Sequence, residues 1–171
     1  MSEIRALVVY YSRGGNSRSV AEDIARALGG AEIEELHDTV DRSGLRGYCR
    51  SCLDSIRERT TSLVEPGRDV SRYDLVVVGG PVWVGKPSAP VRTWLRAHAA
   101  ELHNVAFFLT HGGSARDQVF AAMKAESRSS PLALVSVREG ELGKPEVAAR
   151  IAAFAGELQR AAARSEKIPV G

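Results

Sequence analysis

The chain has 171 residues, of which 44% are hydrophobic and 26% are charged, so its composition is that of an ordinary globular protein with room for a sizeable core. The formal net charge of +2 is small, and no basic run is interleaved with aromatic residues, so we expect no nucleic-acid partner. No apolar run is long enough to span a bilayer and the first residues lack the pattern of a signal peptide, so we expect a cytoplasmic protein without a membrane partner.

Strand-like and helix-like segments alternate along the chain. Short β-branched or alternating runs predict five strands, at residues 4–11, 31–36, 73–80, 105–110 and 132–137. Apolar residues at helical spacing predict a helix after the first strand, ending near residue 28, and further helices over 51–63, 91–100, 117–125 and 145–164. The signal is weakest over 37–72, where charged residues and glycines dominate.

This alternation predicts the fold class. Parallel strands need crossover connections, which helices usually supply with right-handed geometry. We therefore expect one domain over residues 1–171, built on a doubly wound, five-stranded parallel α/β sheet with helices on both faces. In such sheets ligands bind beyond the carboxyl ends of the strands, where the strand order reverses.

The loop after the first strand carries the strongest functional signal. It reads Tyr-Tyr-Ser-Arg-Gly-Gly-Asn-Ser over residues 10–17 and leads into the first helix. The first amides of a helix lack intrahelical partners and attract anions, and Gly14 and Gly15 let the backbone approach a ligand closely. The loop matches neither the P-loop nor the dinucleotide fingerprint, which disfavours nucleoside triphosphates and NAD. The same residues could also serve only as a helix cap.

Two further loops follow strands that should end at the same edge. Residues 81–90 contain three prolines, a glycine and Trp83, and predict a shaped loop after the central strand. His111, Gly112 and Gly113 follow the next strand. Because parallel strands end at one edge of a sheet, the three loops should converge on one site.

Together the three loops resemble those of the flavodoxin family. Residues 10–17 resemble its phosphate loop, Tyr-Asp-Leu-Val-Val-Val-Gly-Gly-Pro-Val-Trp-Val-Gly over residues 73–85 resembles its first flavin loop, and Thr-His-Gly-Gly over 110–113 resembles its second. The resemblance implies a three-layer flavodoxin-like fold of strand order 2-1-3-4-5 with FMN as cofactor. The cofactor-binding residues that it implies are Ser12, Arg13, Gly14, Gly15, Asn16, Ser17, Pro81, Val82, Trp83, Val84, Gly85, Lys86, Thr110, His111, Gly112 and Gly113.

The resemblance also implies roles for these loops. Residues 12–17 would bind the FMN phosphate, Trp83 would cover the isoalloxazine, the chain at Gly85 would lie near flavin N5, and residues 110–113 would hold the pyrimidine edge. Two departures stand out: Gly14 replaces the usual hydroxyl residue, and His111 stands where many flavodoxins stack a tyrosine. The second departure would leave one flavin face open to a substrate.

Several of these residues also have purely structural interpretations. Trp83 could anchor its loop in the core, Lys86 could be a solvated surface charge, and His111 could simply orient the backbone. Cys49 and Cys52 lack the further ligands of a metal site, so we interpret them as two half-buried thiols at a helix start.

These observations predict an FMN-binding redox protein with no catalytic side chain and no metal site. It would pass electrons through the flavin, from a reductase or NAD(P)H, to a protein partner or a small acceptor such as a quinone. Whether it is a carrier or an NAD(P)H-linked oxidoreductase stays open, as does its state as monomer or homodimer. The alternative is a flavin-free interaction or regulatory module that retains the fold.

Overall fold

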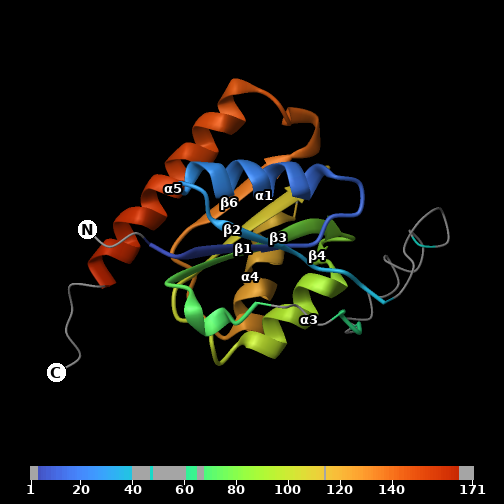
Figure 1. Cartoon of the computed structure of the whole chain (residues 1–171). Coiled ribbons are helices and arrows are strands. Elements are labelled where there is room, and N and C mark those ends of the chain that lie inside the picture. Colours follow the sequence, from blue (N-terminus) through green and yellow to red (C-terminus); the bar gives the residue numbers. More distant parts are fainter. Residues whose placement is uncertain (1–3, 40–46, 48–60, 65–67, 114, 166–171) are drawn as a thin grey trace.

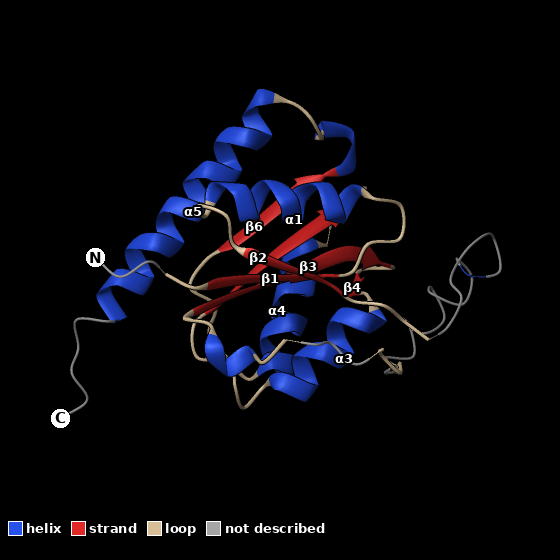
Figure 2. Ribbon diagram, viewed as in Figure 1, coloured by secondary structure: helices blue, strands red, loops and turns tan. Residues whose placement is uncertain are grey.

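The structure, a computed structural model, describes residues 4–39, 47, 61–64, 68–113 and 115–165. A central sheet lies between two helical layers, with α1 and α5 on one face and α3 and α4 on the other (Figures 1 and 2). The strands are β1 (Ala6–Tyr10), β2 (Glu32–Glu35), β3 (Leu75–Trp83), β4 (Lys86–Pro87), β5 (Val105–His111) and β6 (Leu134–Arg138). The helices are α1 (Asn16–Ala27), α3 (Ala89–His98), α4 (Arg116–Ser127) and α5 (Pro145–Ser165), with single 3₁₀ turns at Val70–Arg72 and Glu139–Glu141.

The sheet has the strand order β2-β1-β3-β5-β6, and these neighbours all pair in parallel. Since β5 and β6 are the fourth and fifth strands predicted from the sequence, the expected order 2-1-3-4-5 is confirmed. The order reverses direction at β1, so β1 and β3 lie side by side with their following helices on opposite faces. That arrangement opens the sheet edge at which ligands bind in doubly wound folds.

Burial on both faces explains why the central strands are continuously apolar. One core lies under α1 and α5 and the other under α3 and α4, and Val77 and Val78 of β3 point into opposite cores with no exposed surface. Gly79 is required by close packing, because a Cβ there would lie 2.2 Å from the ring of Phe108. Burial of these side chains supplies most of the free energy that holds the three-layer arrangement.

The segment expected as a loop at residues 81–90 is different in the structure. β3 continues to Trp83, and residues 84–85 turn the chain into β4, which pairs antiparallel to β3. Val84 and Gly85 both have positive φ, 49° and 70°, as in the type I′ turn that joins two-residue hairpins. The chain then enters α3 at Ala89, two residues before the predicted start. The segment that resembles the first flavin loop of the flavodoxin family is therefore a β-hairpin.

The prediction of a helix over 51–63 is wrong at its end. Residues 61–64 are not helical, and Leu63 forms an isolated antiparallel bridge with Asp38. The rest of that segment, including Cys49 and Cys52, lies outside the described residues.

Candidate functional site

The three loops meet at the carboxyl-terminal edge of the sheet, on the right in Figure 1. Residues 12–17 connect β1 to α1, residues 81–86 lie in the hairpin of β3 and β4, and residues 110–113 end β5 and follow it. All of the residues expected from the resemblance therefore come from neighbouring strand ends. Their individual contacts to a cofactor stay predictions.

The loop after β1 presents an open helix N-terminus. Gly15, at the N-cap of α1, has a φ of 93°, and among the described residues no side-chain cap hydrogen bond is made to the first turn of this helix. A Cβ at Gly14 or Gly15 would meet no atom within 4 Å. Ser12 does not cap the helix itself, since its Oγ accepts the Gly15 amide at 3.0 Å. The backbone amides of this first turn are therefore placed to bind an anion, which favours phosphate binding over simple capping.

Ser17 ties this loop to the loop after β5. Its side chain is 2% exposed, and its Oγ lies 2.6 Å from Oγ1 of Thr110, the penultimate residue of β5. Thr110 has no exposed surface, so its hydroxyl serves Ser17 and does not face the edge of the sheet. If Thr110 donates this hydrogen bond, the hydroxyl proton of Ser17 is left for an acceptor in the loop. The pair fixes the position of one loop relative to the other.

The hairpin is held by the packing of Trp83 against Tyr11 and by a hydrogen bond from a buried arginine, Arg92. Trp83 is 9% exposed, and its ring meets Tyr11 edge-on, with centroids 5.4 Å apart and an interplanar angle of 87°. The indole therefore anchors the hairpin in the core, as the structural interpretation of Trp83 foresaw. Arg92 of α3, 2% exposed, donates to the carbonyl of Pro87 at 3.2 Å and lies 4.0 Å from Glu126 of α4.

The hairpin tip reaches the start of α4. A Cβ on Gly85 would lie 3.7 Å from the Cβ of Ala115, the residue before α4, which itself has a φ of 81°. Val84 at the same tip is 54% exposed, and Lys86 is half-buried. The tip of the hairpin therefore lies beside Ala115, the residue that precedes α4.

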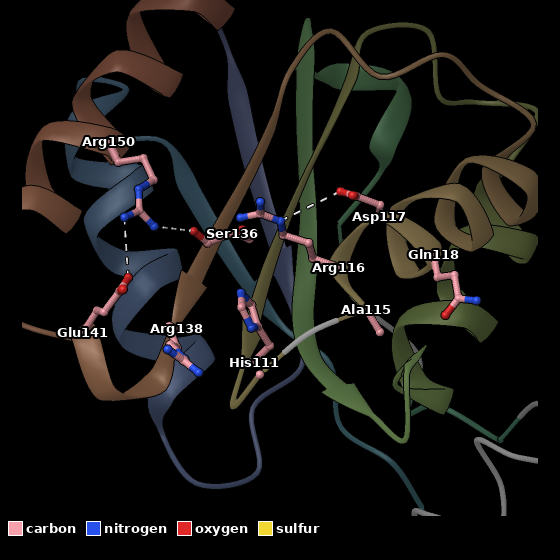
Figure 3. Close-up of a pocket in the computed structure, with 10 residues that line it drawn as sticks. His111, Ala115, Arg116, Asp117, Gln118, Ser136, Arg138, Glu141 and Arg150 are labelled. Carbon is pink, nitrogen blue, oxygen red and sulfur yellow. Dashed lines mark hydrogen bonds and ion pairs between the residues drawn. The ribbon is translucent and has the colours of Figure 1, made fainter.

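A pocket of about 670 Å³ opens beside the third loop (Figure 3). Its lining consists of His111, Gly113, Ala115, Arg116, Asp117, Gln118, Ser136, Arg138, Glu141 and Arg150. Of the residues expected from the sequence, only His111 and Gly113 belong to it. A volume of this size is within the range of small-molecule sites.

The sequence analysis missed the charged residues of this pocket. They come from the first turn of α4, the end of β6, the 3₁₀ turn after it and the second turn of α5. Arg150 donates to the carbonyl of Ser136 at 2.8 Å and lies 3.5 Å from Glu141. The only available signal was that the last strand ends in Arg138, at the same edge as the glycine loops.

Two glutamates of β2, Glu34 and Glu35, lie near the site. Arg18 of α1 binds both carboxylate oxygens of Glu35 at 2.8 Å, and the Tyr10 hydroxyl lies 3.2 Å from the same carboxylate. Burial raises the pKa of Tyr10. Glu34 is 9% exposed, neither of its oxygens has a hydrogen-bond partner, and burial raises its pKa. These carboxylates flank the site but do not line the pocket.

Within the described part of the chain, no group of histidine, cysteine and acidic side chains is arranged to hold a metal ion. The same residues contain no helix long and apolar enough to cross a membrane.

Comparison with known proteins identifies the fold. No protein-family model matches the sequence, and no curated protein sequence matches it significantly. Among solved structures, a flavoprotein from Lactobacillus acidophilus NCFM in complex with FMN is 24% identical, with a TM-score of 0.66 over 82% of this chain and 97% of that one.

Other solved structures have a similar fold. A putative flavoprotein from Bacteroides eggerthii is 17% identical, with a TM-score of 0.68 over 89% of this chain and 98% of that one. The two-electron reduced flavodoxin from Megasphaera elsdenii is 20% identical, with a TM-score of 0.55 over 88% and 98%. The chain has a flavodoxin-like α/β fold, and in structure it resembles flavodoxins and flavoproteins.

Proposed function

We propose that this chain binds FMN at the carboxyl-terminal edge of its sheet and works as a flavin-dependent redox protein. The observation that carries the proposal is the uncapped N-terminus of α1, opened by Gly14 and Gly15 at the point where the strand order reverses. Flavoproteins of the same fold, one of them in complex with FMN, support it.

The residues present fit a flavin monophosphate. The amides of the first turn of α1 and the Ser17 hydroxyl would bind the phosphate, with Gly14 leaving one hydroxyl fewer than the family pattern has. Gly112 and Gly113 are exposed, and a Cβ on either would meet nothing within 4 Å, so their backbone is accessible to a planar ring. Trp83 would contribute as the anchor of the hairpin, and the exposed tip at Val84 and Gly85 would approach the ring.

In this mechanism the protein binds and orients, and bound FMN supplies the electron chemistry. The α1 dipole and amides would hold the phosphate, and the Ser17–Thr110 hydrogen bond would set the distance between the phosphate loop and the ring loop. The hairpin, held by Arg92, would exclude water from one side of the ring.

We further propose that the electron donor is NAD(P)H or a separate reductase and that the acceptor is a small molecule or a protein, in the cytoplasm. The open pocket beside the third loop favours a small-molecule reaction over transfer to a protein alone. Anaerobic reduction by NAD(P)H tests this choice. Rapid bleaching of the flavin supports a reductase, and bleaching only after a reductase is added supports a carrier.

FMN binding itself is tested on the purified protein. A yellow preparation absorbing near ~450 nm that releases FMN on denaturation supports the proposal. A colourless protein that cannot be reconstituted with FMN overturns it and favours a flavin-free module.

Matched glycine variants locate the site. Gly15→Asp places a negative charge in the phosphate loop, and we expect it to abolish FMN binding, whereas the neutral Gly15→Asn should retain weaker binding. Gly29→Asp is the control, because Gly29 also has a positive φ, 89°, and open space but lies at the far end of α1. If both aspartate variants bind FMN equally well, the phosphate is not held at Gly15.

A further inference from the structure

The pocket beside the third loop is built by strand register. His111, the last residue of β5, pairs directly with Arg138, the last residue of β6. Paired residues of neighbouring parallel strands project from the same face, so both side chains lie on the α4 side, where both line the pocket. In the view of Figure 3 the imidazole of His111 lies between Arg138 and Arg116.

The cations in this pocket are only partly neutralised. Arg150 is engaged by Glu141 and by the Ser136 carbonyl. Arg116 is 60% exposed and lies 3.9 Å from Asp117, which is 96% exposed, so this ion pair is weak. The side chain of Arg138 has neither a hydrogen bond nor an ion pair with any described residue. Three arginines thus face two carboxylates, and one arginine is fully available.

Two further groups in the pocket lack partners. His111 is 8% exposed, and its buried Nδ1 has no hydrogen-bond partner among the described residues. A buried polar atom without a partner costs free energy unless a ligand satisfies it. In addition, the N-cap residue of α4, Ala115, makes no side-chain cap hydrogen bond, and residues 116–118 of the first turn line the pocket. Each of these features suits an anion.

We propose that this pocket is an oxyanion site, in which Arg138, Arg116 and His111 bind the phosphate or carboxylate group of a small substrate. The substrate would lie next to residues 110–113, with its uncharged part toward the flavin. The substrate's redox role rests on the proposed function above, but the anion site itself does not. Both ligand types carry the same chemistry, a delocalised negative charge that an arginine can bind through two hydrogen bonds.

The test is a titration of the full-length protein, with and without FMN, followed by amide and imidazole NMR signals. Inorganic pyrophosphate and succinate are the two probes. Shifts at His111 and residues 116–118 support the proposal, and the tighter probe identifies phosphate or carboxylate as the preferred group. Binding without FMN would support the anion site even if the flavin proposal fails. Shifts confined to residues 14–17, or none with either probe, overturn it.

Charge variants supply the control. Arg138→Gln should weaken the binding of the better probe about ten-fold or more, because a charge-assisted hydrogen bond is lost. Arg164→Gln, the same change on an exposed arginine near the end of α5, should leave it unchanged. Equal affinity in both variants overturns the proposal. So does an Arg138→Gln protein whose FMN affinity falls as much as its probe affinity, since the pocket would then hold the flavin itself.

Discussion

The hydrogen bond between Ser17 and Thr110 makes a sharp prediction. It joins two buried hydroxyls 2.6 Å apart, one in the first turn of α1 and one in β5. Ser17→Ala and Thr110→Val each remove one hydroxyl at nearly constant volume and leave the other buried. We expect each single change to lower the free energy of unfolding by about 1–3 kcal/mol.

The double variant distinguishes the loss of the Ser17–Thr110 hydrogen bond from independent losses of stability at the two positions. When both hydroxyls are replaced, no unsatisfied group remains, so Ser17→Ala with Thr110→Val should cost at least about 1 kcal/mol less than the sum of the two single changes. Urea unfolding measures all three, with exposed Ser19→Ala as a control that should change stability by under about 0.5 kcal/mol. Additive losses would show that the two hydroxyls are not coupled.

The two changes should differ in their effect on FMN. If Ser17 binds the phosphate as proposed, Ser17→Ala should raise the dissociation constant of FMN roughly ten-fold or more, as for the loss of a charge-assisted hydrogen bond of about 1.5–3 kcal/mol. Thr110→Val leaves the Ser17 hydroxyl in place and should weaken FMN less. Quenching of flavin fluorescence measures both constants. A larger loss for Thr110→Val would refute the assignment of Ser17 to the phosphate.

Three further predictions concern stability. Val84→Asn should raise the urea midpoint, because asparagine tolerates the positive φ of this exposed position at lower cost; an unchanged or lower midpoint would contradict strain there. Arg92→Met should lower the free energy of unfolding by about 3 kcal/mol, because it removes a buried charge that anchors the hairpin. Arg96→Met, at a half-exposed arginine, should lower it by under about 1 kcal/mol. Similar losses in the two variants would contradict this prediction. Glu34 has a pKa raised by burial, so its protonated form stabilises the folded state below its usual pKa of 4.5, and this contribution is lost as pH rises through the raised value. The free energy of unfolding of Glu34→Gln should therefore rise relative to that of the native chain as pH rises above about 4.5. The control Glu157→Gln, at an exposed glutamate, should show no such rise. If Glu34→Gln and the native chain had parallel pH profiles of stability, the assignment would be contradicted.

The strands of the sheet were predictable because their signal is local, whereas their order 2-1-3-4-5 was implied only by the resemblance to the flavodoxin family. The runs at β1 and β3 are apolar at every position, and only a strand buried on both faces needs that pattern. The hairpin was missed because Pro81 and Pro87 normally interrupt strands. In the structure Pro87 lies in a two-residue strand off the main sheet order, where a missing N–H is tolerated.

Side-chain positions at the site were harder to predict than its loops. The loops were identified from glycines at strand ends, which are visible in the sequence. The burial of Trp83 against Tyr11 and the neighbouring positions of His111 and Arg138 depend on packing and on strand register. Register is specified by the alternation of apolar and polar residues, and β5, which is buried along its whole length, has no such alternation in its sequence.

The proposed phosphate loop consists of eight consecutive residues, 10–17, but those residues cannot form a site by themselves. The amide of Tyr11 is held by the carbonyl of Gly79, and Ser17 finds its partner 93 residues further along the chain. During synthesis the loop therefore lacks these two hydrogen bonds until β3, and then β5, has been made and paired in the sheet. A fragment ending before β5 would carry the whole motif and still lack a fixed Ser17, so binding of the proposed FMN is expected to be one of the last events of folding.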